Sequence, residues 1–310
     1  MKQIDPKNDI VFTPPVTAAL MCRLAGINSD SVVIDNTAGS GALIMAAADA
    51  GAKAAVGIEF EDIPYKMLSD NISERNNASP EGSDAGCAIH IYQGDGMRYY
   101  DIMTGGDVRP EDISALLLNP PYSAEDSGFI FADTVMKNMH SGMAVVLTKA
   151  NSNRDSILEH STLKAVIKMP DIFKGYASVQ AALYVFQCGR PHDIENDKVK
   201  FVDFSSDGYR RSGRKTQKGQ VFEIPGENPD ERYDELVDIV VNGKVDGLKY
   251  YQDVLFEDTL KDNDAWAYDA HRVVDTTPTL EDFKKTVEEY LSWKVGAILR
   301  GEIDVNDKSK

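Results

Sequence analysis

The tetrapeptide Asn119-Pro120-Pro121-Tyr122 directly follows the apolar run 116–118. Because two successive prolines donate no ladder hydrogen bond, the chain must leave a central strand here in a stiff, extended form. In an open α/β sheet, ligands bind at such strand ends. The Asn119 side chain and the Pro120 carbonyl would then offer two acceptors to an amine with two N–H bonds, and Tyr122 could stack on a flat ring. A rigid turn with a buried tyrosine is the plainer alternative.

The chemistry that this arrangement could support is transfer to an aromatic amine. The exocyclic amine of adenine is a poor nucleophile because its lone pair is delocalised into the ring. Acceptors on both hydrogens would draw the nitrogen towards sp³ geometry and localise that lone pair. A methyl group on a sulfonium centre could then be attacked without a covalent enzyme intermediate, through positioning and electrostatics.

A second group of residues with chemical potential follows three apolar runs. Gly39 and Gly41 lie between the run 32–34 and a helix-forming stretch, where glycines and a helix N-terminus allow a ligand to come close to the backbone. The next run ends in Glu59, whose carboxylate could accept hydrogen bonds from both hydroxyls of a ribose. The third run leads into Asp95, which could hold an exocyclic amine such as that of adenine. Together these strand ends predict an adenosyl-containing cofactor.

Other cofactors and metals are disfavoured by what the sequence lacks. Position 44 is Ile, so there is no GxGxxG fingerprint, and no GKS or GKT phosphate loop is present. The three cysteines and five histidines form no CxxC, HxxxH or HExxH pattern. The sequence therefore predicts no metal site. Glu61 is a lower-ranked alternative to Glu59.

The elements that must position these residues follow an alternating pattern through about residue 190. Short runs rich in Val, Ile and Leu alternate with helical stretches at 42–50 and 63–73, which predicts an α/β fold with a mostly parallel sheet covered on both faces. The predicted strands lie at 31–34, 54–58, 89–92, 115–118, 143–147, 165–169 and 179–186, with one more at 201–204.

The composition changes near residue 190, which predicts one domain over 1–190 and a C-terminal extension over 191–310. The extension contains a basic loop, an acidic proline-containing stretch at 224–235 and an amphipathic helix at 279–299, for which Gly301 is a stop signal. The helix could dock on another subunit or pack on its own domain. The loop could contact phosphates or be a solvated surface, and its cations are Arg210, Arg211, Arg214, Lys215 and Lys218.

Composition also limits the location and partners of the chain. Hydrophobic residues make up 42% of the 310 residues, the first nine residues do not resemble a signal peptide, and no run is long enough to span a membrane. We therefore expect a soluble, cytoplasmic protein with no membrane partner. The formal net charge of −17 argues against a protein that holds DNA alone, because such proteins carry a basic face.

A family resemblance rests on the motifs above. Asn-Pro-Pro-Tyr downstream of the glycine turn 35–41, with Phe12-Thr13-Pro14 upstream, resembles the N6-adenine DNA methyltransferases of gamma motif order. Within that class the chain is most similar to the modification subunit of type I restriction-modification systems. The likeness covers about 12–186 and continues more loosely through 204–209. It implies a Rossmann-like class I methyltransferase with a seven-stranded sheet, acting on DNA as an adenine-specific enzyme.

The resemblance also implies roles for individual residues. Seven are expected to hold S-adenosyl-L-methionine: Thr13, Pro14, Asp35, Gly39, Gly41, Glu59 and Asp95. Thr13 and Pro14 would contact its methionine end, Glu59 the ribose and Asp95 the adenine. The target base would be held by Asn119, Pro120 and Tyr122, which form the catalytic motif. Phe173 lies where relatives have a second aromatic facing the base, with Tyr176 as the alternative and a core position as the commoner outcome for a phenylalanine.

The implied partners are DNA, a specificity subunit that reads its sequence, and a restriction subunit. Two departures from the family matter. Asn36 and Ala38 stand where relatives commonly have proline and cysteine. Type I modification subunits also carry a helical domain before Phe-Thr-Pro, whereas here that motif starts at Phe12, so either a compact relative or a truncated chain is expected.

Three other functions remain open from sequence. Enzymes that methylate a glutamine side chain of translation release factors also use Asn-Pro-Pro-Tyr, although they lack Phe-Thr-Pro at this place. RNA adenine methyltransferases are expected to be more basic than this chain. A non-catalytic scaffold that keeps the methyltransferase fold is the alternative from a different class.

Overall fold

The computed structural model describes residues 12–78, 86–214, 216, 219–261, 264–273, 280–300 and 302. Its contacts divide the chain into one unit from Met1 to His271 and a second from Arg272 to Lys310. The first unit holds the sheet and every residue expected at the site. The second holds the helix α8 (Leu280–Leu299).

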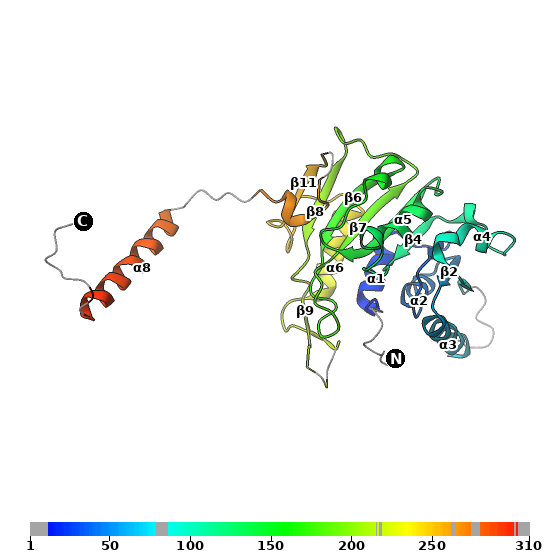
Figure 1. The fold of residues 1–310 in the computed structure, drawn as a ribbon, viewed down its shortest axis with the longest axis horizontal. Helices are drawn as coiled ribbons and strands as arrows, with labels where there is room; N and C mark the ends of the chain where they lie inside the picture. The colour runs from blue at the N-terminus through cyan, green and yellow to red at the C-terminus, as the bar shows by residue number, and fades with distance from the viewer. Residues whose placement is uncertain are drawn as a thin grey trace. The chain divides into compact units, whose positions relative to one another are not determined.

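A nine-stranded sheet organises the described part of the first unit, in the order β11-β8-β6-β7-β5-β4-β1-β2-β3 (Figure 1). The strand β7 runs antiparallel to β5 and β6, and β11 runs antiparallel to β8, while the other neighbouring pairs are parallel. The strands are β1 (Val32–Asp35), β2 (Ala54–Glu59), β3 (Ala88–Gln93), β4 (Ala115–Leu118), β5 (Gly142–Lys149), β6 (Ser161–Lys168), β7 (Ala181–Cys188), β8 (Lys198–Asp203) and β11 (Leu255–Thr259).

The expected mostly parallel α/β sheet is confirmed, but it has nine strands where seven were expected. The additional pairing comes from the C-terminal half, where Leu255–Thr259 joins the sheet through β8. Because β8 and β11 extend the same sheet, the described fold does not divide near residue 190. The contacts divide it after His271 instead.

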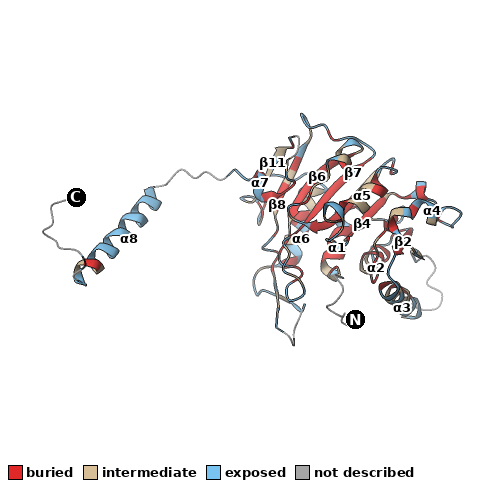
Figure 2. Ribbon diagram, in the orientation of Figure 1, coloured by how far each residue is buried: buried red, intermediate tan, exposed pale blue. Residues whose placement is uncertain are grey.

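Helices cover both faces of the sheet. One hydrophobic cluster is formed with α1 (Pro15–Leu24), α2 (Ala42–Asp49), α3 (Asp62–Ala78) and α6 (Pro229–Val240). The other is formed with α4 (Tyr99–Met103), α5 (Phe129–Met136) and α7 (Tyr268–His271). Successive strand residues alternate between the clusters, which is why the central strands β1, β2 and β4 are continuous apolar runs that are buried along their whole length (Figure 2).

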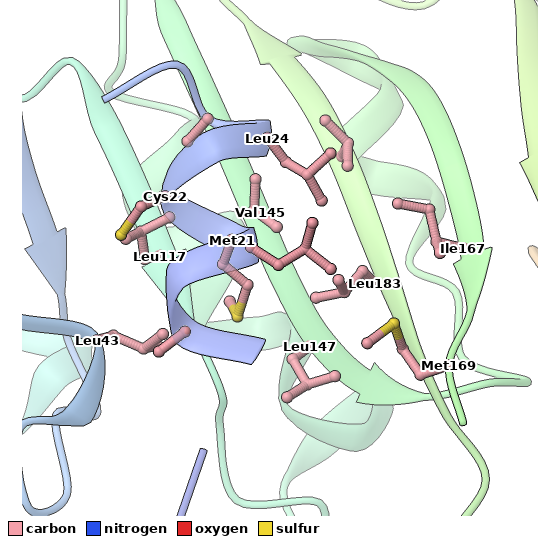
Figure 3. Packing of buried hydrophobic residues seen from close by; sticks show 14 of the residues in the cluster. Met21, Cys22, Leu24, Leu43, Leu117, Val145, Leu147, Ile167, Met169 and Leu183 are labelled. Atoms are coloured by element: carbon pink, nitrogen blue, oxygen red, sulfur yellow. The ribbon is translucent and has the colours of Figure 1, made fainter. Parts of the chain in front are cut away.

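The helix α1 packs across the middle of the sheet, just after the Phe-Thr-Pro motif. Its residues Met21 and Leu24 lie against side chains of β5 and β7, including Val145 and Leu183 (Figure 3). The helix starts at Pro15, a position where the missing N–H of proline costs nothing. This packing fixes the position of Thr13 two residues before the helix.

Two other helices bear on the sequence expectations. Within the acidic stretch 224–235, for which the sequence predicted no element, α6 starts at Pro229 and runs to Val240. The amphipathic helix expected at 279–299 is present as α8, and its apolar side chains Phe283, Leu291 and Trp293 are exposed. Among the described residues, no helix is long and apolar enough to cross a membrane.

Candidate active site

A pocket of about 910 Å³ opens at the carboxyl ends of the neighbouring strands β5, β4, β1 and β2. Asp35 and Glu59 end their strands, Asn119 follows β4, and Asp95 follows β3 by two residues. The parallel order of these strands therefore gathers side chains that are distant in sequence. Nine of the expected site residues line the pocket: Thr13, Asp35, Gly39, Glu59, Asp95, Asn119, Pro120, Tyr122 and Phe173.

Glu59 fixes the glycine turn to the end of β2. Its carboxylate accepts hydrogen bonds from the backbone N–H of Gly39 at 2.7 Å and of Glu61 at 2.8 Å. Gly39 has a φ of 55°, and a Cβ built on it would meet no atom within 4 Å. The turn therefore leaves open space beside a carboxylate whose orientation is already set.

Gly41 has a different role from Gly39. It caps α2 at a φ of 87°, and a Cβ at this position would lie 2.4 Å from the Leu68 side chain of α3. Gly41 is outside the pocket lining, so its conformation serves the close packing of α2 on α3. Pro14, the other expected cofactor residue outside the lining, is the N-cap of α1.

Asp35 is the deepest acid in the pocket, with 2% of its surface exposed. Burial away from water, and the nearby Glu59 carboxylate, raise the pKa of Asp35 to about 7, although the backbone N–H of Thr37 donates to it at 3.0 Å. A cation placed beside Asp35 would favour its ionised form. This corner of the pocket therefore suits a positively charged group.

Asn36 joins three segments through its side-chain and backbone contacts. Its Nδ2 donates to the carbonyls of Gly96 at 3.2 Å and of Phe131 at 3.1 Å. Gly96 lies so close that a Cβ on it would be 1.8 Å from the Asn36 carbonyl oxygen. Among the described residues, Asn36 Oδ1 is buried without a hydrogen-bond partner. Sequence reasoning missed this role, because nothing local to Asn36 indicates Gly96 or Phe131 as its neighbours.

Asp95 lies exposed at the start of the 3₁₀ helix Gly96–Arg98. One of its oxygens accepts the backbone N–H of Met97 at 2.9 Å. The N-cap bond fixes the side-chain rotamer and leaves further acceptor capacity on the carboxylate. Asp95 is thus available to a hydrogen-bond donor in the pocket.

Asn119 is oriented by a residue 106 positions away. Its Nδ2 donates to the hydroxyl of Thr13 at 3.0 Å. Thr13 is itself buried, held by the start of α1. The bond fixes which end of the Asn119 amide carries the acceptor. It also places Thr13 beside the Asn-Pro-Pro-Tyr motif, a position that sequence reasoning assigned to the cofactor alone.

Tyr122 and Phe173 form an aromatic wall, with ring centroids 6.1 Å apart in an edge-to-face arrangement. Burial raises the pKa of the Tyr122 phenol, whose oxygen has no hydrogen-bond partner among the described residues. Phe173 lines the pocket and is also 1% exposed as part of the core. Tyr176 is exposed and outside the lining.

The prolines of the motif are held by an adjacent turn. Gly128, at a φ of 92°, lies against Pro120, where a Cβ would be 2.4 Å from the proline ring. Asp126 and Ser127 in the same turn also have positive φ, which costs free energy outside glycine. The Arg154 guanidinium holds this turn by binding Asp126 at 2.6 Å.

Lys149, Phe131 and Ser123 also line the pocket and were not expected from sequence. Lys149 ends β5, so the register of the sheet brings its cation to the pocket edge. The only sequence signal for Lys149 was its place two residues after the predicted strand 143–147. Across the described residues, no group of three or more His, Cys, Asp or Glu side chains could hold a metal ion.

The sequence and the fold of this chain were compared with those of known proteins. No protein-family model matches the chain. The chain is 24% identical over 332 residues to the type II restriction enzyme and methyltransferase RM.BcgI of Heyndrickxia coagulans, covering 94% of this chain and 47% of that protein. The chain is thus similar in sequence to part of a restriction-modification methyltransferase.

Solved structures support the same fold. A modification subunit of a type I restriction enzyme from Vibrio vulnificus matches with a TM-score of 0.55 and 16% identity, over 80% of this chain and 55% of that one. The type I methyltransferase subunit from Streptococcus thermophilus matches with a TM-score of 0.53 and 15% identity, over 84% and 56%. The fold is that of a class I methyltransferase. This chain spans about half the length of these three relatives.

Proposed function

We propose that this chain transfers a methyl group from S-adenosyl-L-methionine to N6 of adenine in DNA, as the modification component of a restriction-modification system. The observation that carries the proposal is the Thr13–Asn119 hydrogen bond, which orients the Asn-Pro-Pro-Tyr motif in the same pocket as Asp35, Glu59 and Asp95. The sequence relationship to a restriction-modification methyltransferase supports it independently.

The residues of the pocket fit this cofactor. We define the cofactor side of the pocket as Asp35, Gly39, Glu59 and Asp95. It combines a buried acid beside open space over Gly39 with two oriented carboxylates. Asp35 would favour the positive charge of the methionine end, Glu59 would accept from ribose hydroxyls, and Asp95 would accept from the adenine amine.

The base side of the pocket is defined as Asn119, Pro120, Tyr122 and Phe173. Asn119 Oδ1 and the Pro120 carbonyl would accept the two hydrogens of the target amine, so its lone pair faces the cofactor side. The cofactor, when bound, supplies an electrophilic methyl group. Neither acceptor is a base, so the nitrogen would release its extra proton to water after transfer. Tyr122 would stack on a base turned out of the duplex.

The partners proposed for this chain are DNA and a specificity subunit, with a restriction subunit in the same system. A separate reader of the sequence would explain how a chain with a net charge of −17 acts on DNA. The exposed apolar side chains of α8 offer a surface for a partner helix. A match to a structure of an assembled type I restriction-modification system, with a TM-score of 0.55 over 94% of this chain, supports assembly.

The test is a calorimetric titration of S-adenosyl-L-methionine into the chain and two variants. Asp95→Asn keeps the cap on Met97 while removing the charge, so binding should weaken. Asn119→Ala should bind nearly as the unaltered chain does. A transfer assay with tritiated cofactor would then offer duplex DNA, RNA and a glutamine peptide separately. Label on adenine in DNA supports the proposal, label on RNA or peptide supports those alternatives, and absent cofactor binding favours a scaffold.

A further inference from the structure

A two-stranded hairpin extends from the far side of the base-side wall. It consists of β9 (Tyr209–Arg211) and β10 (Val221–Glu223), and residues 209–223 are called the 209–223 hairpin below. Figure 1 shows the ribbon around β9 extending past the edge of the sheet. Of its intervening loop, residues 212–214, 216, 219 and 220 are described.

One segment links this hairpin to the pocket. The 170–180 loop joins β6 to β7 and lines the pocket with Phe173, Ala177 and Val179. Its opposite side meets the hairpin, since a Cβ on Gly219 would lie 2.5 Å from the Tyr176 ring and one on Gly213 would lie 3.7 Å from Lys174. The hairpin is therefore separated from the pocket by a single loop.

The base of the hairpin is anchored by a buried ion pair. The Arg211 guanidinium binds Asp207 with two hydrogen bonds, and the Tyr233 hydroxyl of α6 donates to the same carboxylate at 2.9 Å. Arg211 and Asp207 are both buried side chains. The charge of Arg211 is thereby neutralised and the residue stabilises the fold. Arg211 is therefore not one of the cations that could bind a partner.

The remaining described cations of the hairpin have no such neutralisation. Every arginine in the described ranges forms an ion pair with a carboxylate except Arg210, Arg214 and Arg272, and two of these three lie on the hairpin. Arg210 alternates with Arg211 along β9 and is exposed, with its guanidinium 5.5 Å from the Phe222 ring centroid. Stacking orders the guanidinium while its N–H groups remain free to bind an anion.

The charge continues from the hairpin towards the pocket. Lys174 on the 170–180 loop is exposed and pairs with no carboxylate among the described residues. Lys149 on the pocket edge likewise forms no ion pair with a described carboxylate, and it pairs across the sheet with Ala181, just after the same loop. In a chain of net charge −17, these unneutralised cations lie on the hairpin, on the 170–180 loop that contacts it, and at the end of the strand that pairs with β7 just after that loop.

We propose that the 209–223 hairpin and Lys174 grip the phosphate backbone of duplex DNA beside the extruded base, with Arg210 and Arg214 as the phosphate contacts. The proposal rests on the proposed function, because the base side of the pocket must receive a nucleotide from the strand that the hairpin holds. Lys149 takes the phosphate nearest the pocket. The hairpin positions DNA without reading its sequence, because phosphate contacts carry no base information.

The test compares two double variants with equal charge changes. Arg210→Gln/Arg214→Gln removes the hairpin cations. Lys53→Gln/Lys137→Gln is the matched control, because Lys53 precedes β2 and Lys137 follows α5, at the opposite edge of the sheet from the pocket. The full chain is titrated into a fluorescent 30-base-pair DNA duplex of mixed sequence, and anisotropy is measured from 50 to 200 mM salt.

The hairpin variant should bind the duplex about tenfold more weakly at 100 mM salt, and the slope of log affinity against log salt should fall by about two. The control should retain the slope of the unaltered chain, as should Arg210→Lys/Arg214→Lys, which keeps the charge. Calorimetric affinity for S-adenosyl-L-methionine should be unchanged in all variants.

Three outcomes would overturn the proposal. These are an unchanged slope in the hairpin variant, an equal loss in the control, and no duplex binding by the unaltered chain at 50 mM salt. In each case, intact cofactor binding and methyl transfer would leave the proposed function standing. Conversely, hairpin-dependent DNA binding without cofactor binding would support the hairpin and reject the methyltransferase proposal.

Discussion

On the cofactor side of the pocket, the Glu59 and Asp95 carboxylates already accept backbone N–H groups. On the base side, the Tyr122 hydroxyl is buried without a partner among the described residues, and the motif is held by stiff prolines and a turn with positive φ. The cofactor side is thus a polar site fixed by hydrogen bonds from backbone N–H groups. The base side is fixed by packing and by the distant Thr13.

Because the two sides are held differently, they should respond differently to substitution. Carboxylates that are oriented by backbone N–H groups can change charge while keeping their geometry. Side chains held by packing against another segment lose their position when that segment moves. Substitutions on the cofactor side should therefore act on cofactor affinity, and those on the base side should act on the rate of methyl transfer.

The largest effect is expected for Asn119→Ala on the base side. Loss of one oriented acceptor should lower the rate of methyl transfer to DNA about 10³-fold, on the scale seen for a removed transition-state hydrogen bond. Affinity for S-adenosyl-L-methionine should change less than about twofold. Ser123→Ala, an exposed residue of the same lining, is the control. A rate loss that came with an equal loss of cofactor affinity would break the division into two sides.

Gly128→Ala tests whether packing behind the motif matters. The new Cβ would press on Pro120, and a displacement of the motif by about 1 Å should lower the transfer rate about 10²-fold. Gly105→Ala is the matched control, because Gly105 has a similar φ of 85° but open space around its Cβ position. Single-turnover transfer rates for the two variants would be compared, and equal rates would exclude a supporting role for Gly128.

Asp95→Asn should weaken S-adenosyl-L-methionine binding by about tenfold to hundredfold, since a hydrogen bond to a charged group contributes about 1.5–3 kcal/mol. The cap on Met97 is retained, so the free energy of unfolding should change little. Asp101→Asn, an exposed acid on the neighbouring helix α4, changes the net charge equally and serves as control. Calorimetry reports the affinity, and an equal weakening by both variants would mean that general charge decides it.

The smallest effect is a pH dependence of cofactor affinity. Because burial raises the pKa of Asp35 to about 7, its ionised fraction, and with it the attraction for a cation, should grow by about tenfold from pH 6 to pH 8. The dissociation constant of S-adenosyl-L-methionine should fall accordingly as pH rises and level off above pH 8. Asp35→Asn should flatten the profile. A profile that kept its slope in Asp35→Asn would assign the dependence to another group.

The local sequence determined the strand runs and the residues at their ends. Continuous apolar runs such as 54–58 and 115–118 predict strands covered on both faces, and a parallel sheet brings their carboxyl ends to one edge. That reasoning was sufficient to bring Asp35, Glu59, Asp95 and Asn119 into one pocket. Their positions follow from the period of the strand and from the turn that ends it.

Contacts between distant segments were decided only by the tertiary structure. Hydrogen bonds join Asn119 to Thr13 and join Asn36 to Gly96 and Phe131. Gly128 packs closely against Pro120. Nothing in the sequence indicates that these separated segments are neighbours. The place of β11 in the sheet was also decided only by the tertiary structure, because this strand is half exposed at the sheet edge and lacks a long apolar run. Local periodicity specifies an element and its buried face, whereas the packing of the whole sheet selects the neighbours of each side chain.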